Sequence, residues 1–185
     1  MAGGRNNKTF ALALSAISTA VAVAGLIFGF FVPYMLATGY LIAVVALMVP
    51  LSKQFFVGDA LAYLATCILT VVLGATIKIW NLVPFIMFFG LHPLVNALQI
   101  RFKINRWIAL VVKAIWFDLT LWVGFILIFT VTGGTSWYDE VVRFIDKYLP
   151  FVIIFGGTLI FWLYDYLVFK CQIYINELVY RVAKR

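Results

Sequence analysis

Charged residues are scarce in this 185-residue chain. Asp, Glu, Lys and Arg make up only 11% of the residues, 65% are hydrophobic, and the mean hydropathy is +1.09. A soluble domain of this size with so few charges would expose large apolar surfaces and precipitate. The composition therefore excludes a soluble globular protein and predicts an integral membrane protein in contact with the lipid bilayer.

Cysteine and catalytic motifs are also scarce. Cys67 and Cys171 are the only cysteines, and each lies in or beside a different apolar run. This pattern indicates two buried thiols, with neither a disulfide framework nor a metal site. The sequence contains no glycine-rich phosphate-binding loop, no HExxH zinc motif and no GxSxG nucleophile motif. We therefore expect no enzymatic activity, no cofactor and no ATP site in this chain.

Long apolar runs dominate what is present. Six of them can cross roughly 30 Å of hydrocarbon as α-helices, although the second is short. We expect an all-α integral membrane protein, in which residues 1–185 form a single transmembrane domain. The expected spans of this six-helix bundle are residues 10–31, 34–49, 60–79, 83–100, 107–131 and 151–169. Pro93 lies inside the fourth span, where it should kink the helix and free a backbone carbonyl.

The basic residues predict the orientation of these spans. With the N-terminus inside, the inner segments hold ten Lys or Arg residues and the outer segments hold three. Such a bias is typical of membrane proteins, so the net charge of +7 does not indicate nucleic-acid binding. The inner loop "RFKINR" is the strongest marker. We expect both termini in the cytoplasm, with residues 170–185 as a cytoplasmic tail.

The longest outer segment connects the fifth and sixth spans. Ser136 and Asp139 resemble a helix capping box, and the apolar residues that follow fall on one helical face. Residues 136–149 are therefore predicted to form an amphipathic helix on the outer surface, with Gly133 and Gly134 as a hinge. Two interpretations remain open, a lid over a binding site or a surface connection.

Three ionisable side chains fall at membrane depth, where a charge is costly and normally has a partner. Counting along the spans places Lys113 and Asp165 at one depth, roughly 9 Å from the inner surface. We predict that they form a structural ion pair between the fifth and sixth spans. Asp118 lies deeper, roughly 16 Å from that surface.

His92 lies at nearly the same depth as Asp118, and Asn96 is one turn further along the same helical face. A proton relay, part of a ligand site and a structural hydrogen bond between helices all fit such a pair. Aromatic residues make up 18% of the chain, and the deep Trp122 could line a pocket for a flat, partly polar ligand.

A row of small residues follows one face of the first span: Ala16, Ala20 and Ala24. Small residues let a second helix approach closely, which is a strong drive to association in lipid. The row is therefore a candidate partner interface, although another helix of the same bundle could occupy it.

Several of these features together resemble a known family. The layout of six spans, the small residues of "ALSAISTAVA", the proline in the first outer turn and the basic inner loop resemble the S components of energy-coupling factor transporters. The stretch "FIMFFGLHPLVNALQIRFKINRWIALVVKAIWFDL" also looks like small Firmicutes membrane proteins of that type.

The resemblance implies a substrate-binding subunit in the bacterial cytoplasmic membrane, which captures a small vitamin-like molecule for uptake. It would dock through Ala16 and Ala20 onto a transmembrane scaffold subunit driven by cytoplasmic ATPases. S components bind their substrate in the outer half of the membrane, so the resemblance implies ligand contacts at His92, Trp122, Trp137 and Tyr138. Asp118 completes the predicted substrate-binding set, because it lies beneath His92 and could fix the orientation of the ligand through hydrogen bonds.

A second class of function fits the same residues. The chain could be a non-transporting membrane scaffold, such as a partner subunit of an envelope-assembly complex, in which the buried charges only hold helices together. An enzyme acting on lipid is a third interpretation, which the missing catalytic residues disfavour. A small molecule retained through purification would separate the first two.

Overall fold

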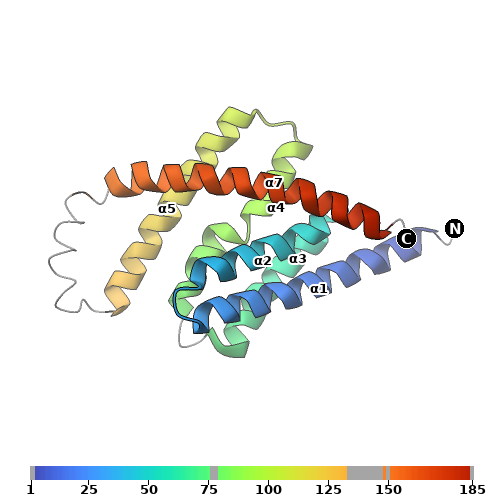
Figure 1. Ribbon diagram of the computed structural model, residues 1–185, viewed down its shortest axis with the longest axis horizontal. Helices are drawn as coiled ribbons and strands as arrows, with labels where there is room; N and C mark the ends of the chain where they lie inside the picture. The colour runs from blue at the N-terminus through green and yellow to red at the C-terminus, as the bar shows by residue number, and fades with distance from the viewer. Residues whose placement is uncertain (1–2, 76–78, 133–147, 149–150, 184–185) are drawn as a thin grey trace. The chain divides into compact units, whose positions relative to one another are not determined.

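The computed structural model describes residues 3–75, 79–132, 148 and 151–183, and all of its secondary-structure elements are helices (Figure 1). The chain divides into two compact units. The first unit draws on residues 1–102 and 168–185, and the second on residues 103–167.

Five helical stretches are long and apolar enough to cross a membrane: Thr9–Phe31, Phe56–Gly74, Ile79–Arg101, Arg106–Gly124 and Ile154–Arg181. A further apolar helix, Leu36–Leu51, has 16 residues and is shorter than a usual span. The expected all-α protein with several membrane-spanning helices is therefore confirmed for the described residues. The count of six spans and the side on which the termini lie stay predictions.

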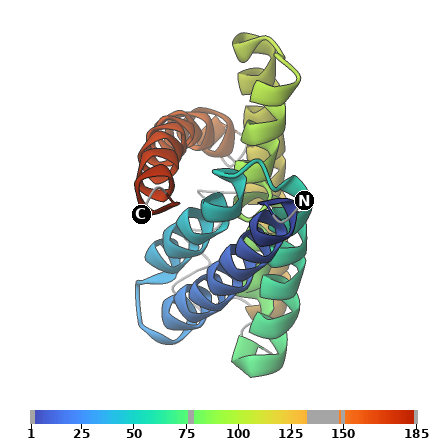
Figure 2. The ribbon, with the colours of Figure 1, turned by 90° about the vertical axis from the view of Figure 1, so that its right-hand side faces the viewer.

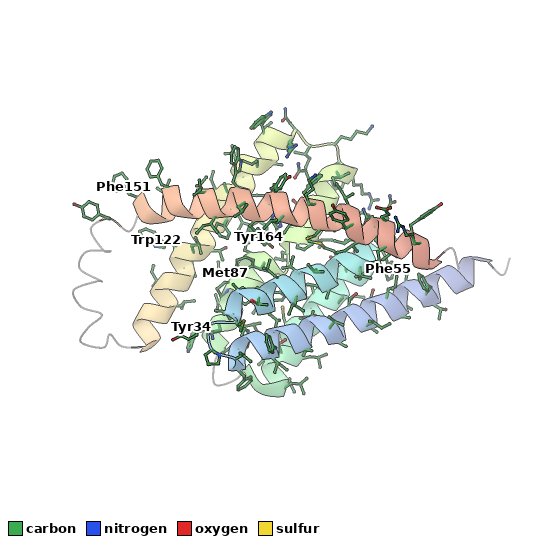
Figure 3. All side chains as sticks on the ribbon, in the orientation of Figure 1. Tyr34, Phe55, Met87, Trp122, Phe151 and Tyr164 are labelled. Atoms are coloured by element: carbon green, nitrogen blue, oxygen red, sulfur yellow. The ribbon has the colours of Figure 1, made fainter. Side chains whose placement is uncertain are left out.

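The first unit contains four α-helices and the end of a fifth. Their bounds are α1 (Gly3–Phe31), α2 (Leu36–Leu51), α3 (Phe56–Thr70), α4 (His92–Arg101) and α7 (Thr158–Ala183). Helices α1, α2 and α3 lie side by side, as both views show (Figures 1 and 2). Tyr34 has a φ of 63° in the turn between α1 and α2 and is fully exposed (Figure 3). Helix α7 continues past residue 169, so most of the expected tail is helical.

Helices α1 and α2 contact each other backbone to backbone. Gly25 and Gly29 of α1 face Gly39 of α2, and a Cβ added to Gly39 would lie 2.7 Å from both the Gly25 carbonyl oxygen and the Gly29 Cα. No side chain fits at that distance, so glycine is required at this crossing. Close approach through small residues is a main source of helix association in lipid. This contact fixes the α1–α2 pair on which the rest of the first unit packs.

The span at Ile79–Arg101 is interrupted. It begins as a 3₁₀-helix at Ile79–Leu82, continues as a π-helix at Phe85–Phe89, and becomes regular only at α4. Pro93 lies in the first turn of α4 instead of kinking a continuous helix. The reason is that proline lacks an N–H, which the first turn of a helix does not need.

Two tyrosines satisfy backbone groups of this interrupted span. The Tyr63 hydroxyl donates to the Ile86 carbonyl at 2.8 Å, and the Tyr40 hydroxyl donates to the Asn81 carbonyl. Within a membrane, carbonyls outside a regular helix need such donors, because lipid supplies none. The aromatic rings of both tyrosines pack against Phe85 in the core of the unit.

The second unit packs α5 (Arg106–Thr132) against a π-helix at Val152–Gly157 and the beginning of α7. The rings of Phe117 and Phe161 lie 5.6 Å apart between these elements. Polar contacts in the same unit, described below, add to this apolar packing.

Candidate functional site

The predicted substrate-binding residues fall in three parts of the chain. His92 begins α4 in the first unit, whereas Asp118 and Trp122 lie on α5 in the second. Trp137 and Tyr138 lie outside the described residues, as do Gly133, Gly134 and nearly all of the predicted outer helix 136–149. A site that joins all five residues therefore stays a prediction.

Asp118 has a hydrogen-bond partner within its own unit. The Thr158 hydroxyl donates to Asp118 Oδ2 at 3.2 Å. The carboxylate also lies against the backbone at Gly157, where a Cβ would be 2.6 Å from Oδ1. These contacts join α5 to the start of α7, as expected of a structural hydrogen bond between helices. Trp122, one turn further along α5, is 38% exposed (Figure 3).

Lys113 and Asp165 are in contact. Lys113 Nζ lies 2.6 Å from Asp165 Oδ1, and the two side chains are 5% and 11% exposed. The pair joins α5 to α7 within the second unit and neutralises two charges that would be costly in a membrane if left alone. Its position away from solvent fits a structural role.

The small-residue row of α1 is exposed on the surface of the first unit. Ala16, Ala20 and Ala24 are exposed, whereas Gly25 and Gly29 make the contact with α2. The row is thus exposed on the surface of the described chain. This leaves the partner-interface hypothesis in place.

Asp59 was missed by the sequence reasoning. The predicted third span began at residue 60, which left Asp59 in a loop, but α3 begins at Phe56 and buries Asp59 to 1% exposure. Its Oδ1 has no hydrogen-bond partner among the described residues. A spacing signal was available, since Asp59, Tyr63, Thr66 and Thr70 recur at helical intervals on one face.

Several hydroxyl groups of α1 and α3 donate hydrogen bonds to carbonyls of their own helix. Thr66 and Thr70 donate to the carbonyls one turn earlier, at 2.7 Å each. Ser15 and Thr19 of α1 do the same. Hydroxyl groups at membrane depth commonly bond back to their own helix in this way. The Asp59 carboxyl differs, because its Oδ1 has no hydrogen-bond partner among the described residues.

Two contacts indicate which part of the span at Ile79–Arg101 lies level with Asp59. Phe56 packs against Arg101, whose guanidinium carbon is 4.9 Å from the ring centroid. Tyr63 packs against Gly90, where a Cβ would lie 2.7 Å from the ring. Helices α3 and α4 therefore run antiparallel here, and Asp59, between Phe56 and Tyr63, falls at about the level of Asn96.

His92 and Asn96 complete the polar region on α4. Both are buried, and the His92 ring lies 5.0 Å from the Phe88 ring. A cavity of about 420 Å³ is lined by Asn96 from α4 and Phe56 from α3, whereas Asp59 and His92 do not line it. The candidate polar residues of the first unit are thus Asp59, His92 and Asn96, of which Asn96 reaches the cavity.

A carboxyl group, an imidazole and a carboxamide offer several acceptors and donors to a small polar molecule. In the part of the chain that the structure describes, no group of three or more His, Cys, Asp or Glu residues could hold a metal ion. Comparison with protein-family models, curated proteins and solved structures finds no match to the chain.

Proposed function

We propose that the chain is a membrane-embedded subunit that binds a small, vitamin-like solute for uptake, with energy supplied by partner ATPase subunits. The buried polar residues Asp59, His92 and Asn96 of the first unit support this proposal. The resemblance to S components supplies the transport role, the transmembrane scaffold subunit and the bacterial cell membrane as the location.

The buried Asp59 carboxyl is the observation that carries the proposal. Burying a polar group without a hydrogen-bond partner costs about 1 to 3 kcal/mol, and a carboxylate costs more. A helix that served only as a scaffold would be more stable with an apolar residue at this position. Ionisable groups within membrane spans mark solute and ion sites for this reason.

The interrupted span strengthens the argument. Transporters commonly build their binding sites from discontinuous helices, because irregular backbone and helix ends present polar groups inside the membrane. Here α4 begins at His92, separated by two residues from the π-helix at Phe85–Phe89, and it contacts α3, the helix that carries Asp59. The polar residues and the helix break therefore occur together.

The second candidate is a non-transporting scaffold. The Lys113–Asp165 pair and the Asp118–Thr158 hydrogen bond favour it, because both need no ligand. The exposed row on α1 fits either function, since an S component and a scaffold both dock onto a partner.

The proposal includes six spans with both termini in the cytoplasm, because the basic residues concentrate in the inner segments. Single cysteines introduced as Tyr34→Cys and Asn105→Cys, in a background with Cys67→Ala and Cys171→Ala, should face opposite sides of the membrane. A membrane-impermeant maleimide added to intact cells should label position 34 alone. Labelling of both positions would exclude this topology.

Solute retention tests the function. We expect the purified protein to retain a small molecule that mass spectrometry of the denatured sample detects. Asp59→Asn should lower retention about tenfold, because one hydrogen-bonded charge contributes roughly 1.5 to 3 kcal/mol. Glu177→Gln is the matched control, since Glu177 is an exposed carboxylate on α7 that pairs with Arg181.

Two further results would redirect the proposal. If no compound is retained, and a panel of vitamins, precursors and nucleobases leaves the melting temperature unchanged, the scaffold function replaces solute binding. If Trp137→Ala weakens binding and Asp59→Asn does not, the solute binds at the outer position that the family resemblance implies. The second result would keep the function and discard Asp59 as the site.

A further inference from the structure

The cavity that Asn96 lines lies between the α2–α3 turn, α4 and residues 168–176 of α7. Its volume is about 420 Å³. The residues that line it are Leu51, Ser52, Gln54, Phe56, Asn96, Ala97, Ile100, Arg101, Val168, Phe169, Gln172, Ile173 and Asn176. A space of this size accommodates a lipid headgroup or a small molecule.

The charged residue that lines the cavity favours an anionic ligand. Among the described residues, Arg101 is the one cationic residue that lines the cavity, and no Asp or Glu lines it. The Arg101 guanidinium is held over the Phe56 ring, 4.9 Å from its centroid, in a cation–π contact. A guanidinium fixed in this way can donate two parallel hydrogen bonds to the oxygens of a phosphate group.

Neutral hydrogen-bonding side chains surround the cation. They are Ser52, Gln54, Asn96, Gln172 and Asn176. Gln172 is itself positioned, because its Nε2 donates to the Asn176 Oδ1 at 2.9 Å and lies 3.4 Å from the Met48 carbonyl oxygen. Such groups suit the ester and hydroxyl oxygens beside a phosphate.

Exposed apolar side chains also line the cavity. Ile100 and Ile173 are 56% and 54% exposed, and they lie among the exposed polar residues Gln54, Arg101 and Asn176. In a membrane, the two isoleucine side chains meet acyl chains. A ligand with a phosphate at one end and hydrocarbon at the other would therefore match both the polar and the apolar lining, whereas a fully polar solute would match only the polar lining.

We propose that this cavity binds the phosphate of an anionic phospholipid headgroup, with Arg101 as the anchor. Arg101, which lines the cavity, is the first residue of the basic segment at residues 101–106, which the proposed topology places at the inner surface. Anionic lipids attract such basic segments at the cytoplasmic leaflet. The proposal does not depend on solute uptake, since a scaffold subunit would have the same cavity.

Native mass spectrometry of the detergent-purified full chain tests the proposal, with titrated phosphatidylglycerol and phosphatidylcholine as probes. We expect phosphatidylglycerol to bind, and Arg101→Gln to weaken it about tenfold or more, because the charged hydrogen bonds are lost. Lys53→Gln is the matched control. Lys53 lies in the same turn as Ser52 and Gln54 but does not line the cavity.

A second variant separates charge from shape. Ala97→Leu should fill part of the cavity and weaken phosphatidylglycerol binding while every charge stays in place. Equal effects of Arg101→Gln and Lys53→Gln, equal binding of phosphatidylcholine, or no effect of Ala97→Leu would each overturn the proposal. Glycerol 3-phosphate is the last probe. If it binds as tightly as phosphatidylglycerol, the cavity binds soluble phosphate compounds and not a lipid headgroup.

Discussion

Replacing Lys113 by Met should lower the free energy of unfolding by roughly 3 to 5 kcal/mol, because the change removes the cation that neutralises the buried Asp165 carboxylate. The expected loss is large since the pair is closed to solvent, with a 2.6 Å contact between Nζ and Oδ1. Asp165→Leu should cost a similar amount. Reversible unfolding in mixed micelles provides the measurement.

The double variant gives the decisive comparison. Removing both charges together should cost much less than the two single losses added, because no uncompensated charge remains. Lys103→Met is the control, since Lys103 is an exposed lysine of the same unit. Simple additivity of the two single changes would contradict a direct interaction between Lys113 and Asp165.

Gly39→Ala is the second substitution for which we expect a large loss. The new Cβ would lie 2.7 Å from the backbone of both Gly25 and Gly29, so α1 and α2 would have to move apart. Overpacking of this kind costs roughly 1 to 3 kcal/mol, and backbone atoms cannot rotate away as a side chain can. The same unfolding measurement should show the loss.

Gly156→Ala is the matched control for this change. Gly156 lies in the π-helix at Val152–Gly157, and a Cβ there meets no atom of the described residues within 4 Å. Its replacement should leave stability unchanged or raise it slightly, because alanine reduces the freedom of the unfolded chain. Equal losses from Gly39→Ala and Gly156→Ala would show that glycine flexibility, and not the helix crossing, is responsible.

The helices were predictable because hydrophobic length alone largely determines where a chain crosses lipid. The predicted first span at residues 10–31 agrees closely with Thr9–Phe31. The third span was placed four residues late, because Asp59 near its start appeared to belong to a loop. A carboxyl group near the end of a span lowers the local hydropathy, so the predicted span began after Asp59 and left this residue out.

The contacts were harder to predict than the helices. Depth follows from the fixed rise per residue, and it correctly placed Lys113 level with Asp165. Depth says nothing about which way a side chain faces around its helix. The alanine row of α1 shows the same limit, because Gly25 and Gly29 make the contact with α2 only through their fit to Gly39. The fit between two helices depends on both of their surfaces, so the spacing of small residues along α1 alone does not predict it.

The hydrogen bonds from Tyr40 and Tyr63 to the interrupted span bear on how the protein is made. A span with carbonyls that its own helix does not satisfy is unstable alone in lipid, so it needs its donors nearby when it enters the membrane. Both donors lie on α2 and α3, which precede the span in the sequence and leave the ribosome first. The order of the helices along the chain therefore lets the earlier pair act as a template for insertion of the interrupted one.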